Sequence, residues 1–261
     1  MTERCFGIKK ARLFGLPVAV CNPETAVERI VSAAEERGGK YVTFCNVHTL
    51  ITTRQDPEYK EVQCAACLVM PDGKPLSWLL RKRGIEASQV AGPDFMERML
   101  SLPEGKNGSH YFYGASEETL KDLRKVLEEK YPAAHIAGME SPPFRELSEE
   151  EEREAVERMN ASGADYIWIG LGAPKQERFM YRNAKDAKGL MLGVGAAFDF
   201  HSGHVRRAPK SFQRLGLEWL YRLLQDPKRL WKRYLVTNTR FLLLVPGYLL
   251  HYAQRKGQRR K

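Results

Sequence analysis

Short apolar runs rich in β-branched residues alternate with stretches of helical periodicity from Ala11 to about Val194. This alternation predicts an α/β fold, in which a parallel or mostly parallel sheet is covered by helices. Strands are predicted at residues 18–21, 41–45, 67–70, 110–113, 134–136, 166–169 and 190–194. Ligands of such open sheets bind beyond the carboxyl ends of the strands. Functional residues are therefore expected in the loops that follow these runs.

Two helices have clear start signals. Asn22, Pro23 and Glu24 supply a capping side chain, a proline at the first helical position and an acid in the first turn. Residues 148–151 form a capping box at the start of an acidic helix that is predicted to end near Met159. We interpret its run of glutamates as a solvated helix face without a catalytic role.

The basic charge of the chain is concentrated at its C-terminal end. Residues 204–261 carry fifteen Lys or Arg and only two acids, Glu218 and Asp226, whereas the whole chain has a net charge of +10, so residues 1–203 are net acidic. Aromatic and aliphatic residues lie between these cations at helical spacing. The pattern predicts two parts, an α/β body (1–203) and a basic amphipathic helical appendage (204–261) that contacts an anionic membrane surface.

The longest apolar run of the appendage is too short to cross a bilayer. It covers residues 241–252 and is interrupted by Pro246 and Gly247, whereas a spanning helix needs about 20 apolar residues. The run is predicted to lie on a membrane. Packing on the body, or on a second subunit of a homo-oligomer, is the alternative, and the sequence leaves both open.

The cysteines favour a reducing compartment. There are five of them, an odd number, and the N-terminal residues contain no apolar signal segment. Cys64 and Cys67 form a C-x-x-C pair, but no second pair or histidine cluster completes a zinc site. We therefore expect core cysteines in a cytoplasmic protein.

Three segments carry candidate chemistry. Asp72 follows an apolar run and precedes Gly73, so it is either a general base or an ordinary turn residue. The loop at 170–177 has two glycines, then Pro174 at the expected first helical position, and can receive a diphosphate, although it is neither G-x-G-x-x-G nor a Walker motif. In segment 193–203, Asp199 can accept the imide N–H of a uracil ring, or it caps a closely packed helix.

Together these segments carry a family resemblance. The set comprises N-V-H (46–48), P-D-G (71–73), G-P-D (92–94), G-L-G-A-P-K-Q-E (170–177), G-V-G-A-A-F-D-F-x-S-G (193–203) and R-A-P-K-x-F-Q-x-L-G-L-E-W-L-Y-R-L (207–223). This set resembles the WecG/TagA/CpsF glycosyltransferase family over nearly the whole chain. The resemblance implies a Rossmann-like body with a membrane-contacting appendage, peripheral on the cytoplasmic face of the membrane. It also implies inverting transfer of a sugar from a UDP-sugar to a polyprenyl-diphosphate-linked acceptor, without a metal or other cofactor.

The resemblance also assigns roles to residues. Asp72 matches the catalytic base, Asn46 a sugar-contacting asparagine and Gln176 a polar residue beside the reacting centre. The donor side comprises Thr43, Phe144, Gly172, Lys175, Gly195 and Asp199. Asp199 reads uracil, and Phe144 either stacks on it or has a core or loop-anchor role. The resemblance assigns Arg222, Arg229, Lys232 and Arg233 to the acceptor diphosphate and the membrane. The chemistry agrees, because a guanidinium group grips phosphate oxygens bidentately, whereas a lysine supplies only a point charge.

Two positions depart from the family pattern. Phe44 stands where many members have threonine, with Thr43 adjacent, and Gln89 stands where they have arginine. Both positions are expected near the donor sugar, so N-acetylmannosamine is not assumed as the donor.

Two other classes of function remain as alternatives. A nucleic-acid-binding protein would explain the basic tail but would leave Asp72, Asn46 and the glycine loops without a role. A dinucleotide-dependent oxidoreductase would need a G-x-G-x-x-G after the first strand, which is missing. We therefore expect no nucleic-acid partner.

Overall fold

A nine-stranded sheet runs through the part of the chain that the structure, a computed structural model, describes, namely residues 4–258. The strand order is β1-β2-β3-β5-β4-β9-β8-β6-β7. The strands are β1 (Arg4–Cys5), β2 (Ile8–Leu13), β3 (Leu16–Ala19), β4 (Tyr41–Cys45), β5 (Leu68–Pro71), β6 (Ser109–Gly114), β7 (His135–Glu140), β8 (Tyr166–Gly170) and β9 (Leu190–Gly193). All neighbours from β3 to β7 in this order are parallel, whereas the β1–β2 and β2–β3 pairs are antiparallel.

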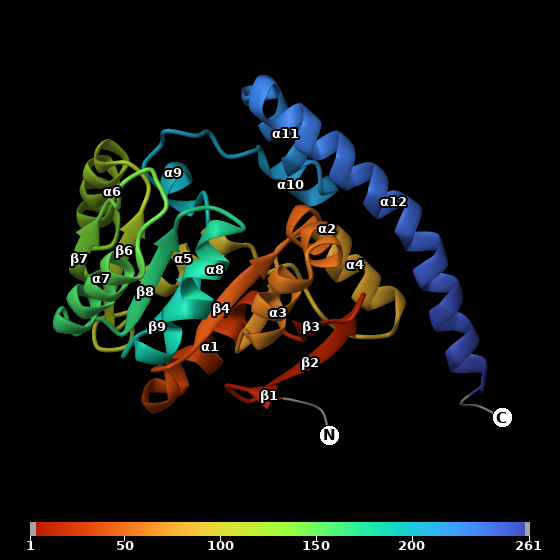
Figure 1. The fold of residues 1–261 in the computed structure, drawn as a ribbon, viewed down its shortest axis with the longest axis horizontal. Helices are drawn as coiled ribbons and strands as arrows, with labels where there is room; N and C mark the ends of the chain where they lie inside the picture. Colours follow the sequence, from red (N-terminus) through yellow and green to blue (C-terminus); the bar gives the residue numbers. More distant parts are fainter. Residues whose placement is uncertain (1–3, 259–261) are drawn as a thin grey trace.

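Helices cover both faces of the sheet (Figure 1). They are α1 (Pro23–Ser32), α2 (Val47–Gln55), α3 (Pro57–Ala65), α4 (Lys74–Lys82), α5 (Gly92–Leu100), α6 (Glu117–Lys130), α7 (Glu149–Ala161), α8 (Lys175–Asn183), α9 (Ala197–His201), α10 (Lys210–Leu215), α11 (Glu218–Gln225) and α12 (Pro227–Gln258), with 3-10 turns at Ala34–Glu36 and Ala184–Asp186. Alternate residues of a strand point to opposite faces. In β4, Val42 and Phe44 accordingly pack with α1 and α5, whereas Tyr41 and Cys45 belong to the core under α2, α4 and α8.

The α/β class and all seven predicted strands are confirmed, with shifts at the ends. The run predicted at 18–21 is the strand Leu16–Ala19, and the run predicted at 134–136 is the longer strand His135–Glu140. The strands β1 and β2 were not predicted. The sequence of β2, Ile-Lys-Lys-Ala-Arg-Leu, buries only its first and last residues. It lies next to the two-residue edge strand β1, and charged residues are common near the edge of a sheet.

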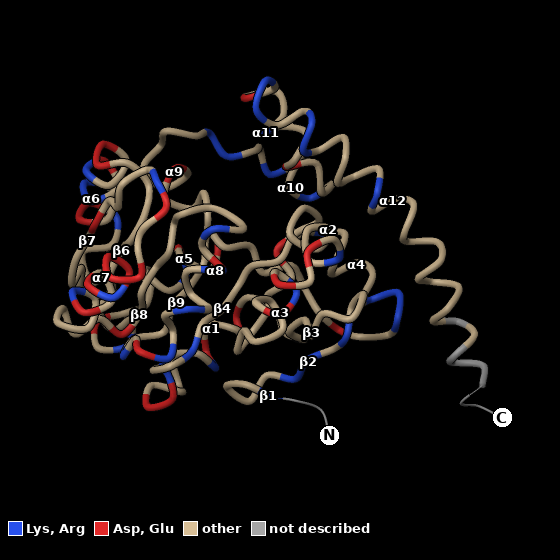
Figure 2. The backbone as a smooth tube through the Cα atoms, viewed as in Figure 1, with Lys and Arg blue, Asp and Glu red and all other residues tan. Residues whose placement is uncertain are grey.

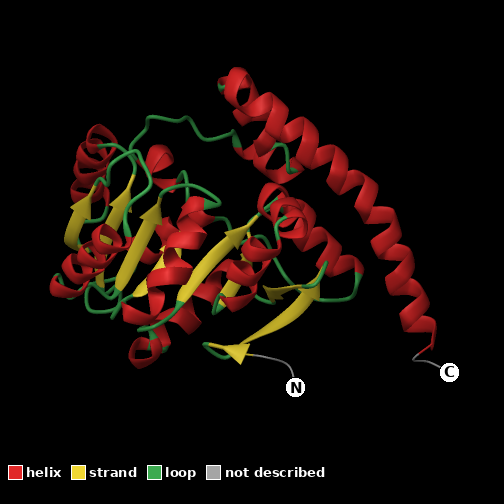
Figure 3. Ribbon diagram, in the orientation of Figure 1, coloured by secondary structure: helices red, strands yellow, loops and turns green. Residues whose placement is uncertain are grey.

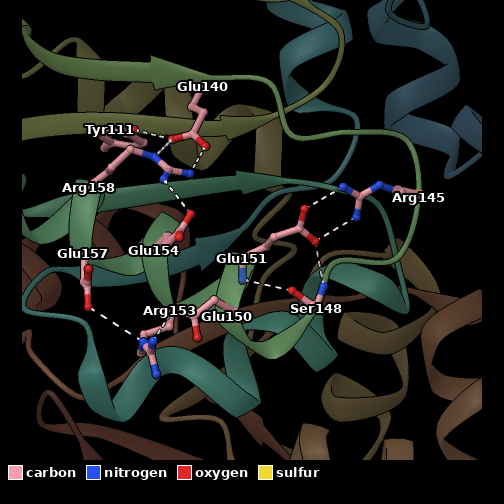
Figure 4. A network of polar contacts seen from close by, with 10 residues as sticks. All are labelled: Tyr111, Glu140, Arg145, Ser148, Glu150, Glu151, Arg153, Glu154, Glu157 and Arg158. Atoms are coloured by element: carbon pink, nitrogen blue, oxygen red, sulfur yellow. Dashed lines mark hydrogen bonds and ion pairs between the residues drawn. The ribbon is translucent and has the colours of Figure 1, made fainter.

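The acidic helix α7 has the predicted capping box and solvated face. The Ser148 hydroxyl accepts from the Glu151 N–H, and the Glu151 carboxylate accepts from the Ser148 N–H and from Arg145 (Figure 4). The hydrogen bonds from Arg145 and the Ser148 N–H lower the pKa of Glu151 to about 2. Ion pairs such as Arg158 with Glu140, at 2.7 Å, cover the rest of this surface.

The appendage is helical, as predicted, but its apolar run is not interrupted. α12 continues through Pro246. One side of it packs on the body. There Phe241 is buried, and the centres of the Tyr248 and Phe14 rings are 4.1 Å apart. Its other side exposes Leu243 and other leucines. The run therefore contacts the body along one side, while the boundary near residue 204 stays a prediction.

No helix among residues 4–258 is both long and apolar enough to cross a membrane.

The prediction that all the cysteines are core thiols was wrong for two of them. Cys5 and Cys67 form a disulfide, 62 residues apart in sequence, instead of standing as separate core thiols. The reason is β1, which no pattern in the sequence indicated. Cys21 and Cys45 are buried as expected, and burial raises the pKa of both thiols to about 12. Cys64 is a half-buried free thiol, so it does not pair with Cys67 across the C-x-x-C.

Candidate functional site

A cavity of about 790 Å³ lies at the carboxyl ends of the parallel strands, the edge at which open α/β sheets bind ligands. The strand arrows point to the side of the molecule on which α10 and α11 lie (Figure 3). Residues of α11 and α12 complete the wall. The predicted site residues that line the cavity are Asn46, Asp72, Phe144, Gly172, Lys175, Gln176, Gly195, Asp199, Arg222, Arg229 and Arg233. The structure thus brings eleven of the thirteen together.

Asp72 lies directly after β5, beside the N-terminal end of α2. Asn46 caps α2 by accepting from the Thr49 N–H at 3.2 Å, so its amide nitrogen is left to donate to the Asp72 carboxylate. Burial, followed by the negative charge of Glu218, raises the pKa of Asp72 to about 7 despite this hydrogen bond and another from the Gly92 N–H. A carboxylate with a pKa near neutrality is suited to accept a proton.

Glu218 is a site residue that the sequence did not single out. It is the first residue of α11, and its carboxylate lines the cavity. The Gln89 amide donates to the backbone oxygen of Asp72 at 2.6 Å and to Glu218 Oε2 at 3.4 Å. Glu218 could have been noticed in the sequence, because it is one of only two acids in an otherwise basic segment.

The loop after β8 forms a second part of the wall. Gly172 has a φ of +75°, a conformation that favours glycine. α8 begins at Lys175, with Pro174 as its N-cap, so the proline stands one position earlier than predicted. Lys175 donates to the backbone oxygen of Arg145 at 2.9 Å. Lys175 therefore lines the cavity, and its ammonium group is held by a hydrogen bond to the loop that contains Arg145.

That neighbouring loop carries Phe144. The side chain is 87% exposed and borders the cavity, which excludes a role as a core anchor. The loop itself is held by Arg145, which bonds to Glu151 through Nη1 at 2.8 Å and Nη2 at 2.5 Å (Figure 4). An exposed ring on an anchored loop is available to stack on a ligand.

Asp199 lies in α9, after the glycine-rich turn that follows β9. Burial raises the pKa of its carboxyl, and the positive charges of Arg222, His204 and Arg229 oppose this shift. Gly195, in the turn, has a φ of +58°. Asp199 therefore faces the cations of the appendage across the cavity.

Those cations form a cluster of three, Arg222, Arg229 and Arg233. The Arg222 guanidinium lies 5.2 Å from the centre of the Phe200 ring, and Arg229 pairs with Asp226 at 2.6 Å. Burial and the charges of the other two arginines lower the pKa of Arg233. The tube drawing shows basic positions along α11 and α12, with few acids nearby (Figure 2). Three cations held together in a cavity wall make a site for an anion such as a diphosphate.

Two predicted residues lie outside the cavity. Thr43 is fully buried and donates to Gln63 Oε1 at 2.8 Å, because strand alternation turns it away from the face that Phe44 occupies. Lys232 is exposed on α12, and the cavity is lined by the next residue, Arg233. The burial of Thr43 argues against its predicted contact with the donor, and the role of Lys232 at the acceptor diphosphate or the membrane stays a prediction.

His48 is a further residue that sequence reasoning left without a role, although it stands in the N-V-H motif. It lines the cavity, and burial together with the charge of Arg233 lowers its pKa to about 4. It is therefore a neutral imidazole at physiological pH. Its position two residues after Asn46 could have suggested that it lies in the site.

Among residues 4–258, no group of three or more His, Cys, Asp or Glu side chains is arranged to hold a metal ion.

Comparison with known proteins agrees with this geometry. Residues 11–256 match the model of the "Glycosyl transferase WecG/TagA/CpsF family". The chain is also similar to a Bacillus spizizenii protein named N-acetylglucosaminyldiphosphoundecaprenol N-acetyl-beta-D-mannosaminyltransferase. The two are 30% identical over 217 residues, which cover 82% of this chain and 79% of the relative. The resemblance of the sequence motifs is confirmed, and the chain belongs to the WecG/TagA/CpsF family of glycosyltransferases.

Proposed function

We propose that the protein transfers a sugar from a UDP-sugar to a polyprenyl-diphosphate-linked saccharide in the synthesis of a bacterial surface polysaccharide. The transfer inverts the anomeric centre and needs no metal. The observation that carries the proposal is the position of Asp72, a carboxyl with a pKa of about 7, in the same cavity as the three clustered arginines.

The donor would lie across the strand ends. Asp199 accepts the imide N–H of uracil, and the exposed Phe144 ring stacks on the base. The diphosphate meets Lys175 and the backbone N–H groups at the start of α8, where the helix dipole favours negative charge. These groups stabilise the UDP that leaves.

The acceptor would enter from the side of the appendage. Its diphosphate is held by Arg222, Arg229 and Arg233, which places a sugar hydroxyl within reach of Asp72. Asp72 takes the hydroxyl proton while the oxygen attacks the anomeric carbon on the face opposite UDP. The bond from that carbon to the UDP oxygen breaks in the same step, which inverts the centre.

The outer side of the appendage supports the proposed contact with a membrane surface. Apolar side chains of the appendage that are more than half exposed and do not line the cavity are Leu215, Leu224, Trp231, Leu235, Leu243 and Leu250. With the neighbouring cations they suit the interface of an anionic bilayer. We place the enzyme at the cytoplasmic face of the cell membrane, where a lipid-linked acceptor is available.

The name of the Bacillus relative describes transfer of N-acetylmannosamine to a diphosphoundecaprenol-linked N-acetylglucosamine. A reaction of this type is proposed here, with the donor sugar left open. Phe44 and Gln89 both line the cavity, and Gln89 is engaged with Asp72 and Glu218. These two positions are where a different donor preference would arise.

The test is UDP release from a panel of UDP-sugars with a short-chain lipid-diphosphate-sugar acceptor. Acceptor-dependent release is expected from one donor, and it should persist in EDTA. The Asp72→Asn variant should lose at least 100-fold, within the range of about 10²–10⁴ that general-base catalysis contributes. Failure of every donor to turn over or to bind would reject the function, and retention on DNA would then favour nucleic-acid binding.

A further inference from the structure

A chain of buried polar side chains runs from the middle of the sheet to the cavity. Thr43, Gln63, Tyr59 and Glu177 are each fully buried, and Gln176 is 3% exposed. Buried polar groups of this kind are costly unless they are hydrogen-bonded. Their positions in β4, α3 and α8 connect three elements around one end of the cavity.

The hydrogen bonds follow one direction through this chain. Thr43 donates to Gln63 Oε1 at 2.8 Å, and Gln63 Nε2 donates to the Tyr59 hydroxyl oxygen at 2.8 Å. The Tyr59 hydroxyl interacts with the Glu177 carboxyl and lowers its pKa, while Glu177 Oε2 is buried without a hydrogen bond. The Glu177 carboxyl is therefore held between Tyr59 on one side and the Gln176 amide, which donates to Oε1, on the other.

Glu177 and the backbone fix the side-chain amide of Gln176. Its Nε2 donates to Glu177 Oε1 at 2.9 Å and to the Gly193 backbone oxygen at 2.9 Å. Both amide hydrogens are used, and the reversed orientation would set the Gln176 oxygen against two other oxygens. The amide orientation is therefore determined by its surroundings.

The other end of this amide, Gln176 Oε1, is buried without a hydrogen-bond partner. It lies beside Gly195, where a Cβ atom would stand 3.7 Å from it. Both residues contribute to the cavity wall. An unsatisfied buried acceptor is destabilising, and a donor group on a ligand would satisfy it.

We propose that Thr43, Gln63, Tyr59 and Glu177 are positioning residues that hold the Gln176 carbonyl oxygen toward the substrate. The group recognised is a hydroxyl or amide N–H of the bound sugar at the Gly195 end of the cavity. This inference rests on the proposed function, because it assigns a recognition contact within that site. Thr43, excluded from direct contact, acts at the far end of the chain.

The alternative is that the buried cluster only stabilises the packing of α3 against α8. A double-mutant cycle separates the two roles. Glu177→Met removes the acceptor at similar volume and is expected to lower kcat/KM for the UDP-sugar used by the wild type about tenfold, the equivalent of one hydrogen bond. Glu177→Gln, which keeps an acceptor for the Gln176 amide, should stay within about threefold of wild type.

In a Gln176→Ala background, the same Glu177→Met change should have less than about a twofold further effect, because no amide remains to be positioned. An equal loss in both backgrounds, or a Glu177→Gln variant as impaired as Glu177→Met, would overturn the inference. If Glu177→Met does not fold, Tyr59→Phe removes a single hydroxyl and takes its place in the same cycle.

A second readout needs no catalysis. In protein with ¹⁵N-labelled glutamine, the side-chain NH₂ signal of Gln176, assigned by its loss in Gln176→Ala, should exchange slowly with solvent. Its protection should fall in Glu177→Met and persist in Glu177→Gln. Fast exchange in the wild type would reject the positioning role even if transfer is observed. Absence of transfer with a protected amide would instead count against the proposed function.

Discussion

Asp72 and Glu218 line one cavity from two distant parts of the sequence, and the charge of Glu218 contributes to the raised pKa of Asp72. The other groups that influence this carboxyl are Asp94, which raises its pKa, and the Asn46 side chain and Gly92 N–H, which lower it. Arg207 of the C-terminal segment pairs with Asp94 at 2.5 Å. The segment that carries Glu218 therefore adjusts the basicity of Asp72.

The first prediction concerns the pH dependence of transfer. Because the base is active when ionised, kcat/KM of the wild type should rise with pH and level off above about 7, the pKa of Asp72. Glu218→Gln removes a negative charge, so the inflection should move down by about one pH unit, and the plateau should be lower because the base is weaker. An unchanged inflection would show that Glu218 does not act on Asp72.

The second prediction compares two neighbours on α12. Arg233→Ala should raise KM for the lipid-diphosphate acceptor by about 10-fold to 100-fold, since hydrogen bonds to charged groups contribute about 1.5–3 kcal/mol. Lys232→Ala is the matched control, because Lys232 is exposed and lies outside the cavity. Steady-state kinetics with the acceptor varied would measure both. Equal effects would mean that charge density, and not a defined site, binds the acceptor.

The third prediction concerns membrane contact. Leu243 and Leu250 are 76% and 66% exposed and lie seven residues apart on α12, which places them on one side of the helix. Changing both to Gln should weaken binding to vesicles containing anionic lipid by at least tenfold, because a buried leucine contributes about 1.5–3 kcal/mol. Sedimentation with vesicles measures this. Turnover of a short-chain soluble acceptor should be retained, and full vesicle binding by the variant would refute the prediction.

The fourth prediction follows from Glu177, whose pKa burial raises from 4.5 to about 7. Between these pH values the folded protein holds a proton that the unfolded chain has lost. The free energy of unfolding should therefore fall as pH rises through this range, with Glu177 contributing about 3 kcal/mol of the decrease. Urea unfolding at several pH values would show it, and the decrease should be smaller in Glu177→Gln. An identical pH dependence in that variant would exclude Glu177 as the source.

The sequence predicted the sheet and most of the cavity wall because these depend on local patterns. β8 is a continuous apolar run and β4 has one polar residue, and the residues that follow such strands meet at one edge. Thr43 was misplaced because choosing between it and Phe44 requires knowing which helices cover each face. Glu218 and the Cys5–Cys67 pair were missed because both depend on contacts between segments far apart in the chain.

The two-sided packing of α12 has a practical consequence for protein production. Removing the helix would take away the outer leucines, but it would also remove Phe241 and Tyr248 from the body and uncover Phe14 between β2 and β3. A truncated protein would lose the exposed leucines of α12 but would expose the apolar surface of the body that α12 covers. Substituting the outer leucines while keeping α12 is therefore the better way to obtain a sample that does not aggregate before crystallisation.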